Sequence, residues 1–268
     1  MTTLGTLSIH LDGSPCGVGC RFCYLGSRRD DGGRRLHLPL AAEALGILRY
    51  DEVAVAISDA ADAAALPALV AAARAPVAVT TTLQMATRAP ELFRGVARVN
   101  LSVDSYKGWA DPARIGALAQ RLAAEHPGID VVLLATLDTP EWAARLVDQG
   151  LLAELVDLPA VDKVALSALK PPPPWCDRAF WMRALGRLQP LLARALETRL
   201  FLDCYVAARL LQLGGCPARA DLSPAAGGVA FRSCVYQPAP DFVAADAPSL
   251  AARLDGFVAP AACPFAIT

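Results

Sequence analysis

The sequence Arg98-Val-Asn-Leu-Ser-Val103, followed by Pro112–His126 and then by Asp130-Val-Val-Leu-Leu-Ala-Thr136, decides the fold class. The first and third segments are short, apolar and rich in β-branched residues, whereas the middle segment is an amphipathic stretch of alanine and leucine. Short apolar strands that alternate with helices of this length predict βαβ units. Such units build a parallel sheet whose faces are covered by helices.

The same alternation extends over the first two-thirds of the chain. Six predicted strands are too few for an eight-stranded barrel, so we expect an α/β fold with a partial (β/α)6 TIM-like barrel. In such folds the functional residues follow the carboxyl ends of the strands. The other predicted strands are Leu4–Leu11, Glu52–Ile57, Val77–Thr82 and Lys163–Leu169, and the other predicted helices are Leu40–Arg49, Ala61–Arg74, Ala89–Arg94 and Pro140–Leu155.

Four consecutive prolines, Pro171–Pro174, mark a change in the pattern. Proline disfavours helix in the residue before it and breaks helix where it lies, so we expect a domain boundary here. Residues 1–170 are the predicted barrel. Residues 171–268 are predicted to hold a long helix (Asp177–Leu196), a possible seventh strand (Arg199–Leu202), a short helix and a short, irregular, cysteine-rich extension that is rich in turns.

The composition excludes several classes of protein. The chain has 268 residues, 54% of them hydrophobic, and a formal net charge of −1. Binding to nucleic acid or to an anionic membrane surface needs an excess of basic residues, so we expect neither partner. No apolar stretch reaches the roughly 20 residues that span a bilayer, and the amino terminus lacks the pattern of an export signal. We therefore expect a cytoplasmic protein, in which the eight cysteines are metal ligands or catalytic groups rather than disulfides.

Three cysteines follow the first predicted strand in the segment Gly13-Ser-Pro-Cys16-Gly-Val-Gly-Cys20-Arg-Phe-Cys23-Tyr-Leu25. Three thiolates on one loop suit an iron–sulfur cluster, and the missing fourth ligand leaves one iron open to an exogenous group. A zinc site and a reduced redox pair are the rival interpretations. Zinc motifs usually pair two Cys-x-x-Cys units, whereas this is a single clustered triplet.

This motif, with Phe22 before its third cysteine, resembles that of the radical S-adenosylmethionine (radical SAM) superfamily, whose partial barrel is also similar to the predicted fold. The resemblance implies that Cys16, Cys20 and Cys23 hold a [4Fe–4S] cluster whose open iron binds S-adenosylmethionine. It implies reductive cleavage to methionine and a 5′-deoxyadenosyl radical, which abstracts hydrogen from the substrate. It also implies a reductant such as flavodoxin or ferredoxin. Phe22 and Tyr24 are expected to line the cofactor.

Other positions match the superfamily unevenly. The family often has Gly-Gly-Glu-Pro after the second strand, whereas this chain has Ile57-Ser-Asp-Ala-Ala-Asp62, in which Ser58 and Asp59, or Asp62, would replace it. Thr80 and Thr82 end the third strand, as threonines do in the family, although threonine is also an ordinary strand residue. Ser102 and Asp104 resemble the family's Ser-x-Asp, which lies near the ribose.

Four later cysteines form a second candidate metal site. The order Cys216, Asp221-Leu-Ser-Pro, Gly228, Cys234 resembles a hairpin in the SPASM and shorter twitch extensions of radical SAM enzymes, which bind auxiliary clusters. Cys204 and Cys263 would complete a set of four thiolates, which predicts a second [4Fe–4S] cluster. Structural zinc on the same cysteines, a three-ligand cluster and buried inert cysteines are the alternatives. Cys176 is expected to be a bystander.

These features together predict a radical SAM enzyme. The auxiliary-cluster extension implies a peptide or protein substrate, as in the maturation of ribosomally made peptides. A small-molecule substrate is one alternative. A second is an iron–sulfur binding or electron-transfer protein of the same fold that does not cleave S-adenosylmethionine, and a third is a module stapled by zinc.

Overall fold

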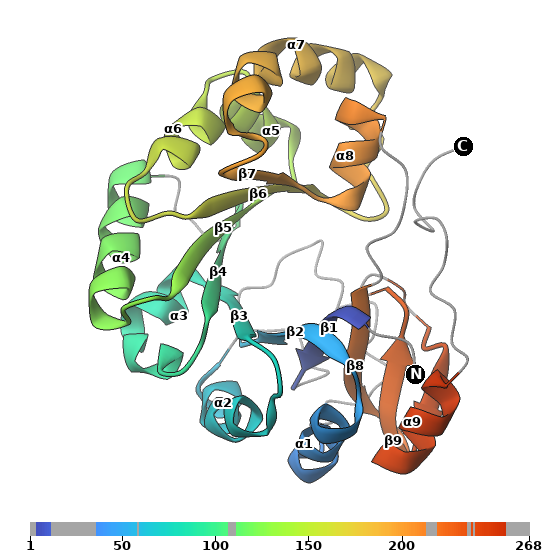
Figure 1. The fold of residues 1–268 in the computed structure, drawn as a ribbon. Coiled ribbons are helices and arrows are strands. Elements are labelled where there is room, and N and C mark those ends of the chain that lie inside the picture. Colours follow the sequence, from blue (N-terminus) through green and yellow to red (C-terminus); the bar gives the residue numbers. More distant parts are fainter. Residues whose placement is uncertain are drawn as a thin grey trace. The chain divides into compact units, whose positions relative to one another are not determined.

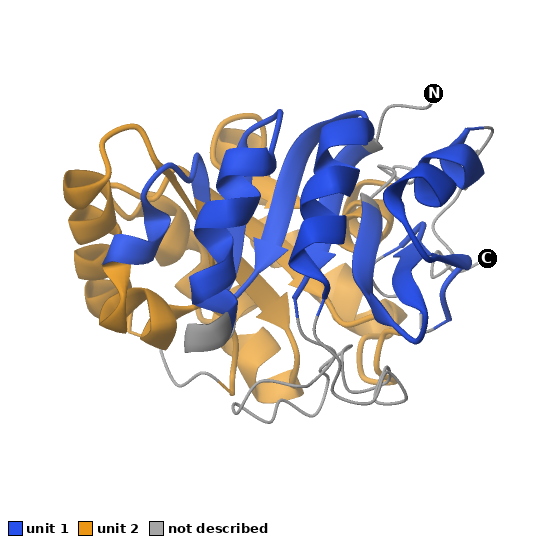
Figure 2. Ribbon diagram, turned by 90° about the horizontal axis from the view of Figure 1, so that it is seen from below, with its two compact units in different colours: residues 1–81, 91–98, 216–261 blue, residues 82–90, 99–215, 262–268 orange. Residues whose placement is uncertain are grey.

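The computed structural model describes residues 4–11, 36–57, 59–106, 111–212, 219–234, 237 and 239–255. The fold is mixed α/β, as predicted from the alternation of strands and helices (Figure 1). The chain forms two compact units (Figure 2). Unit 1 consists of Met1–Thr81, Glu91–Arg98 and Cys216–Ala261, and unit 2 consists of Thr82–Pro90, Val99–Gly215 and Ala262–Thr268.

The described strands of unit 1 follow the order β10-β9-β8-β1-β2-β3. Strand β1 pairs parallel with β8 and with β2, and β2 pairs parallel with β3. Strand β9 pairs antiparallel with both β8 and β10. The strands are β1 (Leu4–His10), β2 (Tyr50–Ala56), β3 (Val77–Thr82), β8 (Arg219–Ala225), β9 (Gly228–Arg232) and β10 (Phe242–Ala244).

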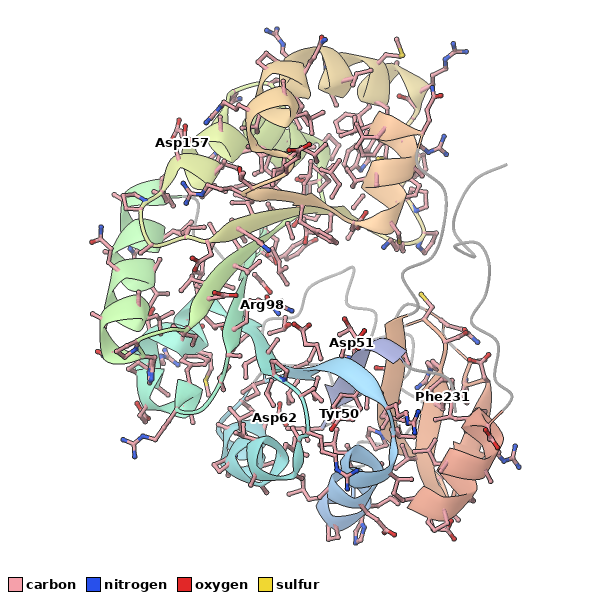
Figure 3. All side chains as sticks on the ribbon, in the orientation of Figure 1. Tyr50, Asp51, Asp62, Arg98, Asp157 and Phe231 are labelled. Carbon is pink, nitrogen blue, oxygen red and sulfur yellow. The ribbon has the colours of Figure 1, made fainter. Side chains whose placement is uncertain are left out.

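Apolar residues at matched positions build the core of this sheet. Ile9, Val55 and Val79 lie opposite one another on β1, β2 and β3, and all three are fully buried. Phe231 on β9 (labelled in Figure 3) stacks on Phe242 of β10, with ring centroids 4.9 Å apart. The helices of unit 1 are α1 (Leu38–Ile47), which packs on both other helices, α2 (Ala60–Ala72) and α9 (Ala247–Leu254).

Unit 2 contains the strand order β4-β5-β6-β7. Helices α4, α5 and α6 pack on β5 and β6, and α8 packs on β6 and β7. The strands are β4 (Arg98–Val103), β5 (Asp130–Leu137), β6 (Lys163–Ala168) and β7 (Leu200–Leu202). The helices are α3 (Leu83–Arg88), α4 (Pro112–Glu125), α5 (Pro140–Val147), α6 (Leu151–Asp157), α7 (Arg178–Ala195) and α8 (Cys204–Leu211). Among the described helices, none is both long and apolar enough to cross a membrane.

The predicted strands are confirmed with bounds that differ by two residues at most, but two helix predictions are wrong. The single helix predicted over Pro140–Leu155 is two helices, because Gly150 adopts a left-handed φ of 84° and caps α6. The helix predicted over Ala89–Arg94 is a 3₁₀ helix, η2 (Pro90–Phe93), and α3 precedes it. The boundary expected at residue 171 stays a prediction.

The carboxyl-terminal region contains more regular structure than its turn-rich sequence predicts. Strands β8 and β9 form a hairpin, and β8 pairs with the first strand of the chain. The sequence of β8, Arg-Ala-Asp-Leu-Ser-Pro-Ala, holds polar residues and a proline that are depleted in strands. Its place in the sheet therefore depends on pairing with β1, a contact that its own composition does not predict.

Gly228 begins β9 with a φ of 146°, and a Cβ atom there would overlap the carbonyl oxygen of Ala244. We expect Gly228→Ala to lower the free energy of unfolding by roughly 2–3 kcal/mol, because backbone conformations that only glycine adopts freely cost other residues up to about 3 kcal/mol. Urea denaturation measures the change. The matched control is Gly227→Ala, where φ is 85° but no atom lies within 4 Å of the new Cβ; it should cost only about 1 kcal/mol. Equal effects would contradict the role of the backbone contact.

Candidate functional site

The carboxyl ends of β1, β2 and β3 form one edge of unit 1. His10 lies opposite Ala56, which lies opposite Thr80, so the three residues are at one level of the sheet. The residues that follow these positions are also connected: Thr81 Oγ1 donates a hydrogen bond of 2.9 Å to the carbonyl of Ile57. The segment with the three clustered cysteines follows β1 in the sequence and lies outside the described residues.

Asp59, which was predicted to contact S-adenosylmethionine, caps helix α2. Its carboxylate accepts a hydrogen bond of 2.8 Å from the backbone N–H of Asp62. Asp62 itself lies buried on α2 (labelled in Figure 3). An aspartate at this position satisfies a backbone donor that the helix leaves without an intrahelical partner. The first carboxylate in the segment after β2 thus stabilises the start of α2.

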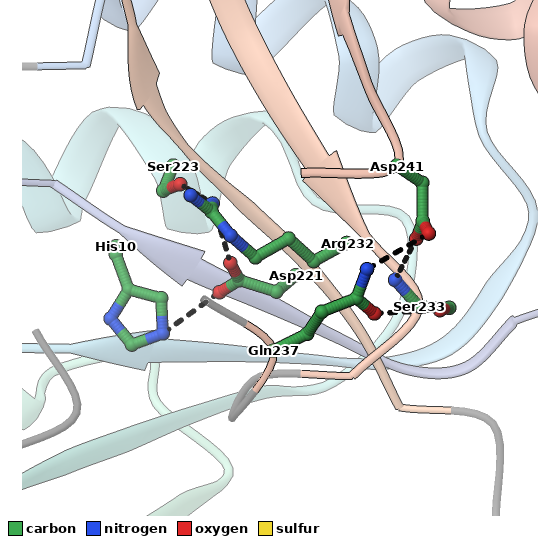
Figure 4. A network of polar contacts seen from close by, with 7 residues as sticks. All are labelled: His10, Asp221, Ser223, Arg232, Ser233, Gln237 and Asp241. Carbon is green, nitrogen blue, oxygen red and sulfur yellow. Dashed lines mark hydrogen bonds and ion pairs between the residues drawn. The ribbon is translucent and has the colours of Figure 1, made fainter. Parts of the chain in front are cut away.

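A buried network of charged groups connects β1, β8 and β9 in unit 1 (Figure 4). His10 Nε2 lies 2.9 Å from Asp221 Oδ1, and Arg232 Nη1 lies 3.5 Å from Asp221 Oδ2. Arg232 also donates a hydrogen bond to the hydroxyl of Ser223. Each of the four residues is at most 3% exposed. Buried charges of this kind are stable only when they are paired, so the network joins the hairpin to the strand that precedes the cysteine segment.

The sequence did not indicate this network. Asp221 and Ser223 belong to a segment that was expected only to resemble part of a hairpin, and Arg232 ends the apolar strand β9. Asp221 and Arg232 become partners because they lie directly opposite one another in the β8–β9 hairpin. A buried arginine opposite a buried aspartate is recognisable only once the register of the two strands is known.

Cys234 lies just beyond β9, within a polar loop that Figure 4 also shows. Its carbonyl accepts a hydrogen bond of 3.0 Å from the backbone N–H of Gln237. Asp241 accepts hydrogen bonds from the N–H of Ser233 (2.6 Å) and from Nε2 of Gln237 (3.0 Å). The Cys234 side chain is half-buried. These bonds connect Cys234 and its neighbour Ser233 to residues later in the same loop.

In unit 2 the residues predicted near the cofactor lie where strands end and helices begin. The hydroxyl of Thr82 accepts a hydrogen bond of 3.0 Å from the N–H of Met85 and caps α3. Ser102 is half-buried on β4. Asp104 follows β4, is 3% exposed, and accepts a hydrogen bond of 3.1 Å from the N–H of Tyr106.

Asp138 follows β5 and lies beside the end of β4, and sequence reasoning missed it. Its Oδ2 accepts two hydrogen bonds from Ser105, one from the backbone N–H (2.8 Å) and one from the hydroxyl (2.7 Å). Burial raises the pKa of Asp138 above its ordinary value, the bonds from Ser105 offset part of this rise, and the charge of Asp104 adds to it. The available signal was an aspartate directly after an apolar strand, the same pattern that singled out Asp104.

A second polar cluster follows β6 and β7. The ammonium group of Lys170 donates to Cys204 Sγ at 3.2 Å and lies 3.4 Å from Asp203 Oδ2. Asp203 caps α8 by accepting from the N–H of Val206 at 2.7 Å. The ammonium group of Lys170 thus lies between the sulfur of Cys204 and the carboxylate of Asp203, at the start of α8. Sequence reasoning identified Cys204 but missed Lys170 and Asp203.

Cys176, the expected bystander, is buried below α7 and α8 rather than at a strand end. Burial raises the pKa of its thiol to about 11. The thiol therefore stays protonated at neutral pH, which does not suit a metal ligand.

Several predicted site residues lie outside the described residues: Cys16, Cys20, Phe22, Cys23, Tyr24, Ser58, Cys216 and Cys263. Cys204 belongs to unit 2 and Cys234 to unit 1. The three-cysteine and four-cysteine ligand sets both stay predictions. Among the residues that are described, no group of three or more histidine, cysteine, aspartate or glutamate side chains is placed to hold a metal ion. Searches against protein-family models and against curated proteins find no match to this chain.

Proposed function

We propose that this chain is a radical SAM enzyme that uses a [4Fe–4S] cluster to cleave S-adenosylmethionine reductively. One observation carries the proposal: the motif Cys16-x-x-x-Cys20-x-Phe22-Cys23 directly follows β1, which lies among the parallel strands of unit 1. We further propose that the strands and helices form a partial (β/α)6 TIM-like barrel with a carboxyl-terminal auxiliary-cluster region. The parallel pairing of β8-β1-β2-β3 and of β5-β6-β7 supports this.

The proposed donor set fits an iron–sulfur cluster chemically, since three thiols are soft ligands. Cys16, Cys20 and Cys23 would hold the cluster. When bound, it supplies the electron that cleaves S-adenosylmethionine to methionine and a 5′-deoxyadenosyl radical, which abstracts hydrogen from the substrate. The protein's own task is to bind and orient the reactants and to exclude water.

Residues at the carboxyl ends of the strands are the proposed contacts of S-adenosylmethionine. In unit 1 these are Ser58, Asp59 and Thr80, together with Phe22 and Tyr24 beside the cysteines. In unit 2 they are Thr82, Ser102 and Asp104. The burial of Asp104 and the position of Thr80 at the end of β3 support these roles, because ligand contacts in α/β folds gather at that edge of the sheet.

The proposed substrate is a peptide or protein, and the proposed electron donor is a flavodoxin or ferredoxin of the cytoplasm. The second cysteine constellation supports the peptide class. Its hairpin, β8–β9, precedes Cys234, which lies in a hydrogen-bonded loop, and the ammonium of Lys170 donates a hydrogen bond to Cys204 Sγ. Cys204, Cys216, Cys234 and Cys263 would hold a second [4Fe–4S] cluster. A small-molecule substrate is the alternative within the same activity.

A second candidate function is an iron–sulfur binding or electron-transfer protein of the same fold that does not cleave S-adenosylmethionine. It is favoured by the segment after β2, where the family's Gly-Gly-Glu-Pro is replaced and where Asp59 caps α2. A carboxylate that satisfies a helix terminus is less available to the amino group of a ligand.

One assay separates these functions. The protein is reconstituted anaerobically with iron and sulfide, reduced with dithionite, mixed with S-adenosylmethionine and analysed by chromatography. Formation of 5′-deoxyadenosine supports the enzyme, whereas an intact cluster without this product supports the electron-transfer protein. A colourless protein that contains zinc would overturn both.

Replacing Cys234 with alanine tests the auxiliary cluster. We expect the loss of roughly four iron atoms per chain, because a [4Fe–4S] cluster normally needs four thiolates, while the first cluster and 5′-deoxyadenosine formation in the absence of substrate persist. Iron analysis and electron paramagnetic resonance of anaerobically purified protein make the measurement. Ser233→Ala, at the neighbouring position in the same loop, is the matched control and should retain all iron. An unchanged iron content in Cys234→Ala would refute the second cluster.

A further inference from the structure

One carboxylate oxygen of Asp138 has no hydrogen-bond partner among the described residues. Ser105 supplies two donors to Oδ2, whereas Oδ1 is buried and accepts none. The whole residue is 7% exposed. A buried carboxylate oxygen without a donor is unfavourable by about 1–3 kcal/mol, so such an atom at a strand end is expected to receive a donor from a ligand.

The surroundings of Asp138 favour a positively charged donor. Asp104 follows the neighbouring strand, and its charge raises the free energy of a second carboxylate beside it. A cation at Oδ1 offsets both the burial and the repulsion, whereas a neutral hydroxyl group offsets neither charge.

We propose that Asp138 binds a protonated amine or guanidinium group of the substrate. This inference rests on the proposed function, for which it names the chemical class of the substrate: a cationic side chain or amino terminus of a peptide, or an amine of a small molecule. Asp138 lies directly after β5 and Asp104 directly after β4. In α/β folds this edge of the sheet is where substrates bind.

The position also explains why Ser105 contacts Asp138 through both its backbone and its hydroxyl. The two bonds fix the carboxylate plane and satisfy Oδ2, which leaves Oδ1 as the atom that receives the ligand. A charge-assisted bond from an ammonium or guanidinium group is stronger than a neutral one. The carboxylate is therefore oriented before the ligand arrives.

The test is a titration of the reconstituted protein, without reductant, with n-butylammonium chloride. The protein is labelled with ¹³C at its aspartate carboxyl groups, and the signal of Asp138 reports binding. This signal is assigned by its absence from the spectrum of Asp138→Asn. We expect a saturable shift of this signal in the wild type. Equilibrium dialysis with ¹⁴C-labelled n-butylammonium gives the dissociation constant of both proteins, and we expect binding to be about tenfold to hundredfold weaker in Asp138→Asn. Asp130→Asn is the matched control at the exposed opposite end of β5, and it should bind as the wild type does.

Further arms of this titration identify the ligand. n-Butanol, which has the same chain length but no charge, should not shift the signal. S-Adenosylhomocysteine at saturation should leave n-butylammonium binding unchanged, since the site is proposed for the substrate. Peptides with a free or an acetylated amino terminus, and with lysine or norleucine, then separate peptide sources from small amines.

Four results would overturn the inference: no shift in the wild type, equal binding by Asp138→Asn, equal binding of n-butanol, or displacement by S-adenosylhomocysteine. Because the titration needs no reductant, its outcome is separable from that of the proposed function. Protein that forms 5′-deoxyadenosine but does not bind the amine refutes the inference alone. Protein that binds the amine but never forms 5′-deoxyadenosine refutes the enzymatic function alone.

Discussion

Replacing Cys20 with alanine is expected to abolish the amino-terminal cluster and to reduce 5′-deoxyadenosine formation at least about a thousandfold, to the background of the assay. The physical reason is the small number of ligands. With three thiolates holding four irons, removal of the central one leaves two, and a cluster held by two cysteines is not retained. Without it, no group in the described chain supplies the electron for cleavage of the sulfonium. Iron analysis, visible absorbance and chromatography of the same anaerobic preparation make the measurement.

The chain offers a matched control for this variant. Cys176→Ala makes the same chemical change at a buried thiol whose raised pKa, about 11, keeps it protonated at neutral pH. It should keep its iron and its product formation, with at most a modest loss of stability from the small cavity. If Cys20→Ala formed 5′-deoxyadenosine at the wild-type rate, the cluster assignment would be refuted. If both variants lost iron equally, the effect would be structural rather than one of ligation.

Arg232→Met is expected to lower the free energy of unfolding by roughly 3–5 kcal/mol, the cost typical of breaking a buried ion pair by removing one partner. The guanidinium lies 3.5 Å from Asp221, and both side chains are at most 2% exposed. The methionine fills part of the volume, but the charge of Asp221 stays buried with less compensation. Urea denaturation of the protein, followed by circular dichroism, measures the change.

The double variant Asp221→Asn with Arg232→Met separates charge from packing. Removing both charges should recover a large part of the lost stability, because the uncompensated carboxylate is then absent. Arg49→Met, at an exposed position between α1 and β2 of the same unit, is the control and should change stability by no more than about 0.5 kcal/mol. A loss in Arg232→Met no larger than that of the control would show that the network does not stabilise unit 1.

Cys20 and Arg232 differ in how far the sequence alone points to them. Cys20 is identified by a short motif whose resemblance to that of radical SAM enzymes implies its proposed role. Arg232 is identified by no motif, and its importance follows only from the register of the hairpin that places it opposite Asp221. His10 links the two, because it ends β1, contacts Asp221, and is followed by the segment that carries the cysteines.

The candidate site in unit 2 was predictable in part. Asp104 was found because it follows an apolar strand and matches a family pattern, and the structure buries it at that strand end. Asp138 occupies the equivalent position after β5, so the same signal was present. Lys170 and Asp203 gave no such signal. Lys170 lies beside prolines, and Asp203 follows a strand of only three residues, so their meeting with Cys204 depends on packing between β6, β7 and α8.

The order of the strands from β1 to β7 was determined by the sequence alone, because it depends on local periodicity. Val77–Thr82 and Arg98–Val103 were predicted with their observed bounds for this reason, and the break at Gly150 needed only the left-handed φ of one glycine. Only the tertiary structure decided that β8 pairs with β1, that Arg232 faces Asp221, and that one oxygen of Asp138 has no donor among the described residues. These features come from contacts between residues far apart in the chain. Strand register and packing set the burial and the partners of such residues, and local composition predicts neither.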